Sequence, residues 1–129
     1  MAGITDLQQL LRSMQPHLAE EEFVFCSVTG SAEDYFSWKP LAIFYEQEGI
    51  SLVVTKQTAE ENYVEFDNTY KQITLTVHSS LDAVGLTAAV STKLADHGIS
   101  ANVIAAFYHD HIFVQSRHAN KALKLLESW

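Results

Sequence analysis

The fold is decided by residues 72–116, which read QITLTVHSSLDAVGLTAAVSTKLADHGISANVIAAFYHDHIFVQS. Apolar and polar residues alternate from Ile73 to His78, and this period of two is typical of a half-buried strand. A helical pattern then opens at Gly85 and has an apolar stripe at spacings of three and four. The stripe consists of Ala83, Leu86, Val90 and Leu94. Gly98 predicts the end of this helix, with Ile99 packing back on its last turn.

Two more strands are predicted at residues 102–108 and 112–116, joined by a polar turn at His109-Asp110. A final amphipathic helix at 119–126 carries apolar residues at Ala119, Leu123 and Leu126. The predicted order of this part of the chain is therefore strand, helix, strand, strand, helix.

Several residues of this segment together resemble a known module. They are Gly85 and Leu86 at the helix start, Leu94 near its end, Gly98 and Ile99 at its cap, and Asn102 and Val103 entering the next strand. With them, residues 77–107 resemble an ACT domain, a small ferredoxin-like βαββαβ module that binds amino acids and regulates metabolic enzymes. The hairpin AFYHDHIFV (106–114) extends the likeness to stand-alone bacterial proteins built of two ACT-like halves.

The resemblance implies an α+β, ferredoxin-like protein whose antiparallel sheets are covered by helices. We expect a degenerate ACT-like half at 1–70 and an ACT domain at 71–129. Two strands flanking Glu48-Gly49, followed by a helix from Thr58, repeat the hairpin-then-helix order of the later half. Six strands are predicted, whereas two complete units contain eight. Short segments that escape notice, or strands shared between halves or subunits, would account for the difference.

The earlier half begins with a predicted helix whose apolar residues are Leu7, Leu10, Leu11 and Met14, ending before Pro16. The acids 20–22 are interpreted as a solvated turn before a strand at 23–28. Cys26 in that strand reads as a small core residue rather than a nucleophile.

Residues 29–40 show no helical stripe where a βαββαβ unit has its first helix. Either the helix is reduced to a loop or very short turn, or this half is built differently. The aromatic residues Tyr35, Phe36 and Trp38 would then line a ligand pocket or fill the gap left by the helix.

Composition limits the classes of function. The chain has 129 residues, of which 47% are hydrophobic and 19% charged, so it can bury a core. Its formal charge of −8 is uneven: residues 1–70 hold 12 acids and 3 Lys/Arg, whereas 71–129 hold 4 and 5. This excess of acid argues against a nucleic-acid partner and against an anionic membrane surface. No apolar run approaches a membrane span, and the N-terminus lacks a secretion signal, so the cytoplasm is expected.

The candidate ligand site is the turn between the strand ending near His78 and the following helix. Unpaired amides and the dipole at the helix start favour a carboxylate, and Gly85 leaves room for its approach. Asp82 could accept from an ammonium group, and Asn102 could donate and accept at the same ligand. Carried over from ACT domains, the resemblance implies ligand contacts by Ser80, Asp82, Gly85, Leu86 and Asn102. The alternative is that Ser80 or Asp82 only caps the helix and Gly85 only allows close packing.

The sequence His109-Asp110-His111 has residue types found at metal sites, but a polar hairpin turn or a dimer contact is the other interpretation. No nucleophile elbow, phosphate loop or metalloprotease helix is present. We therefore expect no catalysis, cofactor or metal, and a homodimeric regulatory module with an amino-acid ligand between modules. A ligand-free interaction module is the alternative.

Overall fold

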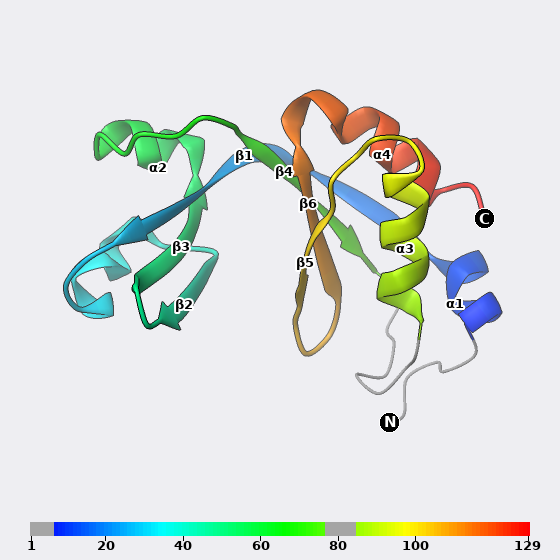
Figure 1. Cartoon of the computed structure of the whole chain (residues 1–129), viewed down its shortest axis with the longest axis horizontal. Coiled ribbons are helices and arrows are strands. Elements are labelled where there is room, and N and C mark those ends of the chain that lie inside the picture. The colour runs from blue at the N-terminus through cyan, green and yellow to red at the C-terminus, as the bar shows by residue number, and fades with distance from the viewer. Residues whose placement is uncertain (1–6, 77–84) are drawn as a thin grey trace. The chain divides into compact units, whose positions relative to one another are not determined.

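The computed structural model describes residues 7–76 and 85–129, which form helices and strands in the order shown in Figure 1. The helices are α1 (Leu7–Ser13), α2 (Lys56–Glu61), α3 (Leu86–Ala95) and α4 (Ala119–Leu126), with 3₁₀ helices at Ala32–Trp38 and Ser116–His118. The strands are β1 (Pro16–Val28), β2 (Ala42–Glu46), β3 (Gly49–Thr55), β4 (Tyr70–Leu75), β5 (Asn102–Ala105) and β6 (Asp110–Gln115).

The chain divides into two compact units, and one of them is discontinuous in sequence. Met1–Glu20 joins Lys71–Trp129 in what we call the split unit, whereas Glu21–Tyr70 forms the middle unit. The described residues before Glu21 therefore pack with the later part of the chain.

In the split unit the strand order is β1-β4-β6-β5, with β1 contributing its residues up to Glu20. A βαββαβ module places its last strand beside the first, then the third and the second. The observed order is the same when β4, β5 and β6 are the first, second and third strands of the module and β1 supplies the last. The predicted α+β, ferredoxin-like fold is therefore confirmed. β5 and β6 are antiparallel, with Asn102 opposite Phe113 and Ala105 opposite Asp110.

Helices α1, α3 and α4 lie together in Figure 1 and contribute apolar residues to one core. In α4 the buried residues are Ala119, Ala122 and Leu126, whereas Leu123 of the predicted stripe is only half-buried. The residues at the centre of this core are less than 2% exposed: Ile73, Leu75, Val90, Leu94, Ile112, Val114, Ala122 and Leu126. Gly98 ends the helix α3 in the predicted way, since its φ is +73° and the Ile99 amide donates to the Leu94 carbonyl at 2.9 Å.

In the middle unit β2, β3 and β1 are antiparallel neighbours. The first helix of this half is reduced to the 3₁₀ helix, which is capped by Ser31 and Asp34. Tyr35 and Trp38 meet edge to face at 4.9 Å and pack against the core of the unit. These two rings therefore fill the space of the missing helix, while Phe36 is 55% exposed.

Strand β1 accounts for part of the shortage of strands: because it serves both units, the six strands of the described residues fill seven of the eight places. It has 13 residues, and the boundary between the two units falls inside it, after Glu20. Its later residues pair with β3 from Phe23 opposite Thr55 to Val28 opposite Ile50. The described residues contain six strands, and one of them serves both units. A shared strand was one of the alternatives that the sequence left open.

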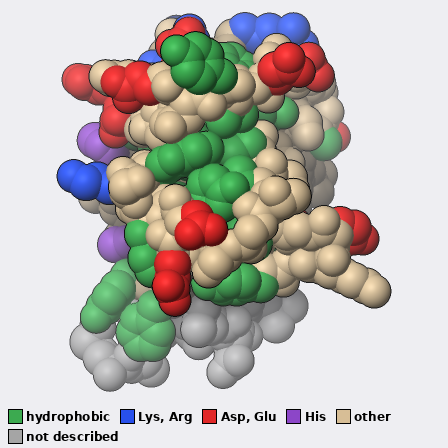
Figure 2. Space-filling view, turned by 90° about the vertical axis from the view of Figure 1, so that its left-hand side faces the viewer, with side chains coloured by type: hydrophobic (Ala, Val, Ile, Leu, Met, Phe, Trp, Pro, Cys, Tyr) green, Lys and Arg blue, Asp and Glu red, His purple; other side chains and the backbone are tan. Residues whose placement is uncertain are grey.

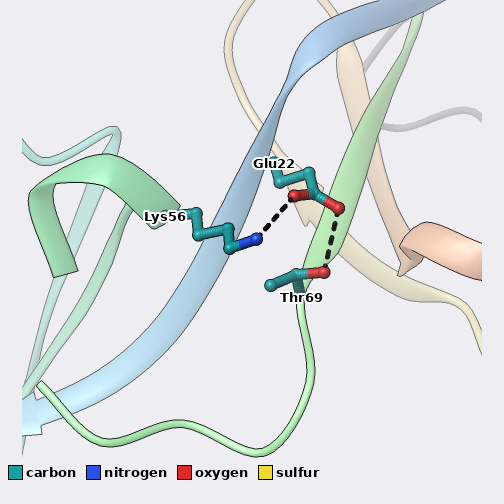
Figure 3. A network of polar contacts seen from close by, with 3 residues as sticks. All are labelled: Glu22, Lys56 and Thr69. Carbon is teal, nitrogen blue, oxygen red and sulfur yellow. Dashed lines mark hydrogen bonds and ion pairs between the residues drawn. The ribbon is translucent and has the colours of Figure 1, made fainter. Parts of the chain in front are cut away.

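The prediction of a turn at residues 20–22 is wrong, because these acids lie within β1. Figure 3 shows what holds Glu22 there: its carboxylate lies 3.5 Å from the Lys56 ammonium and accepts a hydrogen bond from the Thr69 hydroxyl at 3.1 Å. Polar partners on neighbouring segments thus stabilise a charged strand residue that local composition assigns to a turn.

The helix predicted to begin at Thr58 also starts elsewhere. Thr55 is its cap, and the Thr55 hydroxyl accepts from the Thr58 amide at 3.2 Å. The helix ends at Glu61, and Tyr63 has a φ of +58° and is 92% exposed. Phe66 reaches the core of the middle unit from outside the helix.

We expect Leu94→Ala to lower the free energy of unfolding by about 2–5 kcal/mol, because the fully buried side chain leaves a cavity in the core of the split unit. Urea denaturation followed by circular dichroism measures the change. Leu41→Ala is the matched control, since Leu41 is 48% exposed and its loss should cost less than about 0.5 kcal/mol. Equal losses in the two variants would contradict the assignment of Leu94 to the core.

Candidate functional site

The residues predicted to bind a ligand are only partly described: Ser80 and Asp82 lie outside the described residues. Gly85 is the residue before the first turn of α3 and has a φ of +97°. A Cβ atom at this position would lie 3.1 Å from Cδ2 of Leu7. The glycine therefore permits the close approach of α1, and it has no side chain that could cap the first amides of α3.

The other two predicted residues take part in the fold of the split unit. Leu86 is 5% exposed and belongs to its core, so only its backbone is placed to meet a ligand. The Asn102 amide nitrogen donates to the Phe113 carbonyl at 3.2 Å, which fastens the start of β5 to β6.

Gly85 and Asn102 are not brought together within one module. Gly85 directly precedes α3 and Asn102 follows its other end, and a helix of ten residues is about 15 Å long. This helix is longer than a free amino acid, so a single ligand would meet the two positions only if they came from different modules.

A surface groove of about 560 Å³ does contain Gly85. It is lined by Leu7 of α1, by Gly85, Ala88, Ala89, Thr92, Lys93 and Asp96 along α3, and by Trp129. The Lys93 ammonium lies 4.2 Å from the centre of the Trp129 ring and donates to the backbone carbonyl of Ser128. Sequence reasoning missed this groove. The sequence pattern that could have indicated it is a second stripe along α3, in which small residues recur at spacings of three and four. These residues are Gly85, Ala88, Ala89 and Thr92.

His111 has defined partners on β4. Its Nδ1 lies 2.9 Å from the Thr74 hydroxyl oxygen and 3.0 Å from the Gln72 amide nitrogen. Because an amide nitrogen only donates, Nδ1 is the acceptor and the neutral ring carries its proton on Nε2. Burial, followed by the charge of His109, lowers the pKa of His111, while Asp110 opposes the shift. The ring therefore fastens β6 to β4 in its neutral form.

The pKa of the neighbouring Asp110 carboxyl is shifted in the opposite direction. Burial raises the pKa of Asp110, while His111 and His109 act to lower it. Asp110 is the first residue of β6 rather than a turn residue. Within residues 7–76 and 85–129, no three His, Cys, Asp or Glu side chains are grouped in a way that could hold a metal ion.

Cys26 has the character expected of a core residue. Its side chain packs against the core of the middle unit, and burial raises the pKa of its thiol. A raised pKa keeps the thiol protonated, which is the opposite of what a nucleophile needs.

Comparison with protein families identifies the two halves. One ACT domain model matches residues 2–71 and a second matches residues 69–128. The chain belongs to the ACT domain family. ACT domains are regulatory rather than catalytic modules, and the recognised resemblance is confirmed.

Solved structures agree with this assignment. A protein of unknown function from Vibrio cholerae, described as a possible transport protein, is 55% identical and has a TM-score of 0.87. The match covers 93% of this chain and 92% of that protein. A protein from Agrobacterium tumefaciens is 19% identical and covers 88% of this chain over 86% of its own, with a TM-score of 0.66. The ligand-free regulatory subunit of aspartate kinase from Thermus thermophilus is 8% identical, with a TM-score of 0.61. The match covers 86% of this chain and 93% of that subunit. The last two share the fold.

No curated protein matches the sequence significantly. The helices of residues 7–76 and 85–129 are all too short to cross a membrane.

Gly85→Ala should destabilise the protein more than Gly98→Ala. Both glycines have positive φ, which costs alanine about 1–2 kcal/mol, but only at Gly85 would the added Cβ meet another side chain, that of Leu7. Chemical denaturation of the two variants measures the difference. Leu7→Ala in the Gly85→Ala background should recover part of the loss, and a lack of recovery would contradict the Leu7 contact.

The stability of the protein should depend on His111 as the pH falls. The pKa of His111 is lower in the folded state, so the unfolded state binds the proton more readily. The contribution of His111 to the free energy of unfolding is therefore complete above the pKa of the unfolded state, about 6.5. This contribution declines as the pH falls from there toward the pKa of the folded state. The free energy of unfolding should therefore decrease less between pH 7.5 and 5.5 in His111→Gln than in the wild type. His17→Gln, at an exposed position, is the control and should follow the wild type. Parallel curves for His111→Gln and the wild type would contradict the assignment.

Proposed function

We propose that this protein is a regulatory module that binds a small molecule, an amino acid, at an interface between ACT modules. The observation that carries the proposal is the pair of ACT matches, which together span residues 2–128. We further propose that residues 1–70 and 71–129 are the two ACT-like repeats of the sequence, with the described residues before Glu21 completing the split unit, and that the protein acts in the cytoplasm as a homodimer without catalysis of its own.

The proposed site is the turn leading into α3. Gly85 cannot cap the first amides of this helix, so the helix start keeps donors for a ligand carboxylate. The Leu86 side chain is buried, and its proposed contribution is therefore its backbone amide. Asp82 would accept from the ammonium group and Ser80 would add a hydroxyl, so that both ends of an α-amino acid are recognised.

Asn102 would complete the site from another module. Because α3 separates Gly85 from Asn102, we assign the turn to the 71–129 module of one subunit and the asparagine to the same module of the other subunit of the homodimer. A ligand held in this way stabilises the associated state over the separated one. It shifts the equilibrium only as far as its affinities for the two states differ.

The alternative function is a module that binds other proteins without a ligand. The observation that favours it is the exposure of large aromatic side chains, among them Phe44 at 61%, Tyr45 at 74% and Phe107 at 70%. The two functions are separated by whether free amino acids stabilise the fold.

A thermal-shift screen against the twenty amino acids should give one ligand or a small group of related ligands that raises the melting temperature with concentration. Asp82→Ala and Asn102→Ala should each lower the ligand affinity at least about tenfold, a loss of about 1.4 kcal/mol. Asn62→Ala is the matched control, since Asn62 also donates to a backbone carbonyl, that of Thr58, but lies in the middle unit.

Circular dichroism must show that each variant is folded. Equal affinity in Asn102→Ala and Asn62→Ala would remove Asn102 from the site. No stabilisation by any amino acid at millimolar concentration would favour the interaction module.

A further inference from the structure

The charge of the protein is concentrated in one unit. Glu21–Tyr70 contains ten Asp and Glu but only two Lys and Arg, a net charge of −8. The remaining residues contain six of each sign, so the middle unit accounts for the whole formal charge of −8. A field of this size attracts basic partners and repels acidic ones.

The middle unit also ends in an edge strand with exposed aromatic rings. β2 is the last strand of its sheet, and β3 is the only strand that pairs with it among residues 7–76 and 85–129. Phe44 and Tyr45 are adjacent, so their rings leave opposite faces of the strand, and they are 61% and 74% exposed. Unpaired edges are often protected by charged side chains, above all lysine, or by proline; β2 contains neither lysine nor proline, and its one charged residue is Glu46 at its end.

Acidic side chains lie close to this edge in the chain. Glu46 ends β2 and Glu48 is in the following turn, and both are exposed. Glu33 and Asp34 are exposed on the preceding 3₁₀ helix. Figure 2 looks onto the side of the molecule that carries β2 and shows hydrophobic side chains with acidic ones around them.

We propose that β2 is a docking edge for an extended, basic segment of a partner protein. Such a segment would add a strand to the sheet, and its alternating side chains would meet Phe44 on one face and Tyr45 on the other. Its Lys or Arg residues would lie near Glu46 and Glu48. A second copy of this chain is the less favourable occupant, because two middle units each bring a charge of −8 to the contact.

This docking edge is independent of the proposed amino-acid site, which lies at the start of α3 in the split unit. The proposal therefore holds or fails whether or not an amino acid binds.

A synthetic peptide of alternating Lys and Val tests the proposal, and a peptide of alternating Glu and Val is its control. Fluorescence anisotropy should show binding of the Lys peptide alone, weakening as salt rises from about 50 to 300 mM because the charges are screened. The double variant Phe44→Ser/Tyr45→Ser should bind at least about tenfold more weakly. Phe107→Ser/Tyr108→Ser is the matched control: it removes two adjacent rings, 70% and 67% exposed, from the split unit and should bind as the wild type does.

Hydrogen exchange of the wild type gives a measurement that does not depend on the folding of a variant. Added Lys peptide should slow the exchange of amides in Ala42–Glu46, because the edge groups of β2 become hydrogen-bonded. Unchanged exchange in this strand at saturating peptide would overturn the proposal, as would equal affinities in the two double variants. A dimer that Phe44→Ser/Tyr45→Ser dissociates in sedimentation equilibrium, without peptide binding, would overturn it in favour of a second copy.

Discussion

Both units of this protein depend on the hydrogen bonding of one strand. β1 pairs with β3 through residues 23–28, while its earlier residues belong to the split unit, where β4 is its neighbour. A strand without a partner exposes backbone groups that must otherwise be satisfied by water. Because β1 is 13 residues long, it completes the strand order of the split unit and begins that of the middle unit. Two ACT-like halves are therefore built from fewer strands than two separate modules would need.

Local patterns in the sequence predicted the elements whose stability is local. The burial of Leu86, Val90 and Leu94, the glycine stop at Gly98 and the bounds of α4 follow from periodicity and capping, and the structure has them where they were expected. Ala83, the first residue of the predicted stripe, lies outside the described residues. The length of β1 could not be predicted in this way. Acids at 20–22 read as a turn, and only Lys56 and Thr69, far along the chain, show why Glu22 lies in a strand.

The candidate site likewise depends on contacts between distant segments that local sequence patterns do not contain. Gly85 was selected from its position at a helix start, but the closeness of Leu7, which leaves little room for a Cβ atom, joins residues far apart in the chain, and no local pattern contains it. The partners of His111 on β4 are likewise known only from the fold. Residue type and helix position therefore suggested which residues could bind a ligand. They could not show that Gly85 lies beside Leu7 or that the Asn102 amide donates to the Phe113 carbonyl.

The discontinuity of the split unit has a consequence for biosynthesis. As the ribosome releases the chain, the middle unit is complete once Tyr70 has emerged, and β1 can already pair with β3. Helix α1 precedes the middle unit in the chain, whereas its partner α3 follows that unit. During synthesis the apolar residues of α1 therefore lack their α3 contacts until Leu86–Ala95 has also emerged from the ribosome. Apolar surface that is exposed in this way before its partner is made is the kind that chaperones protect.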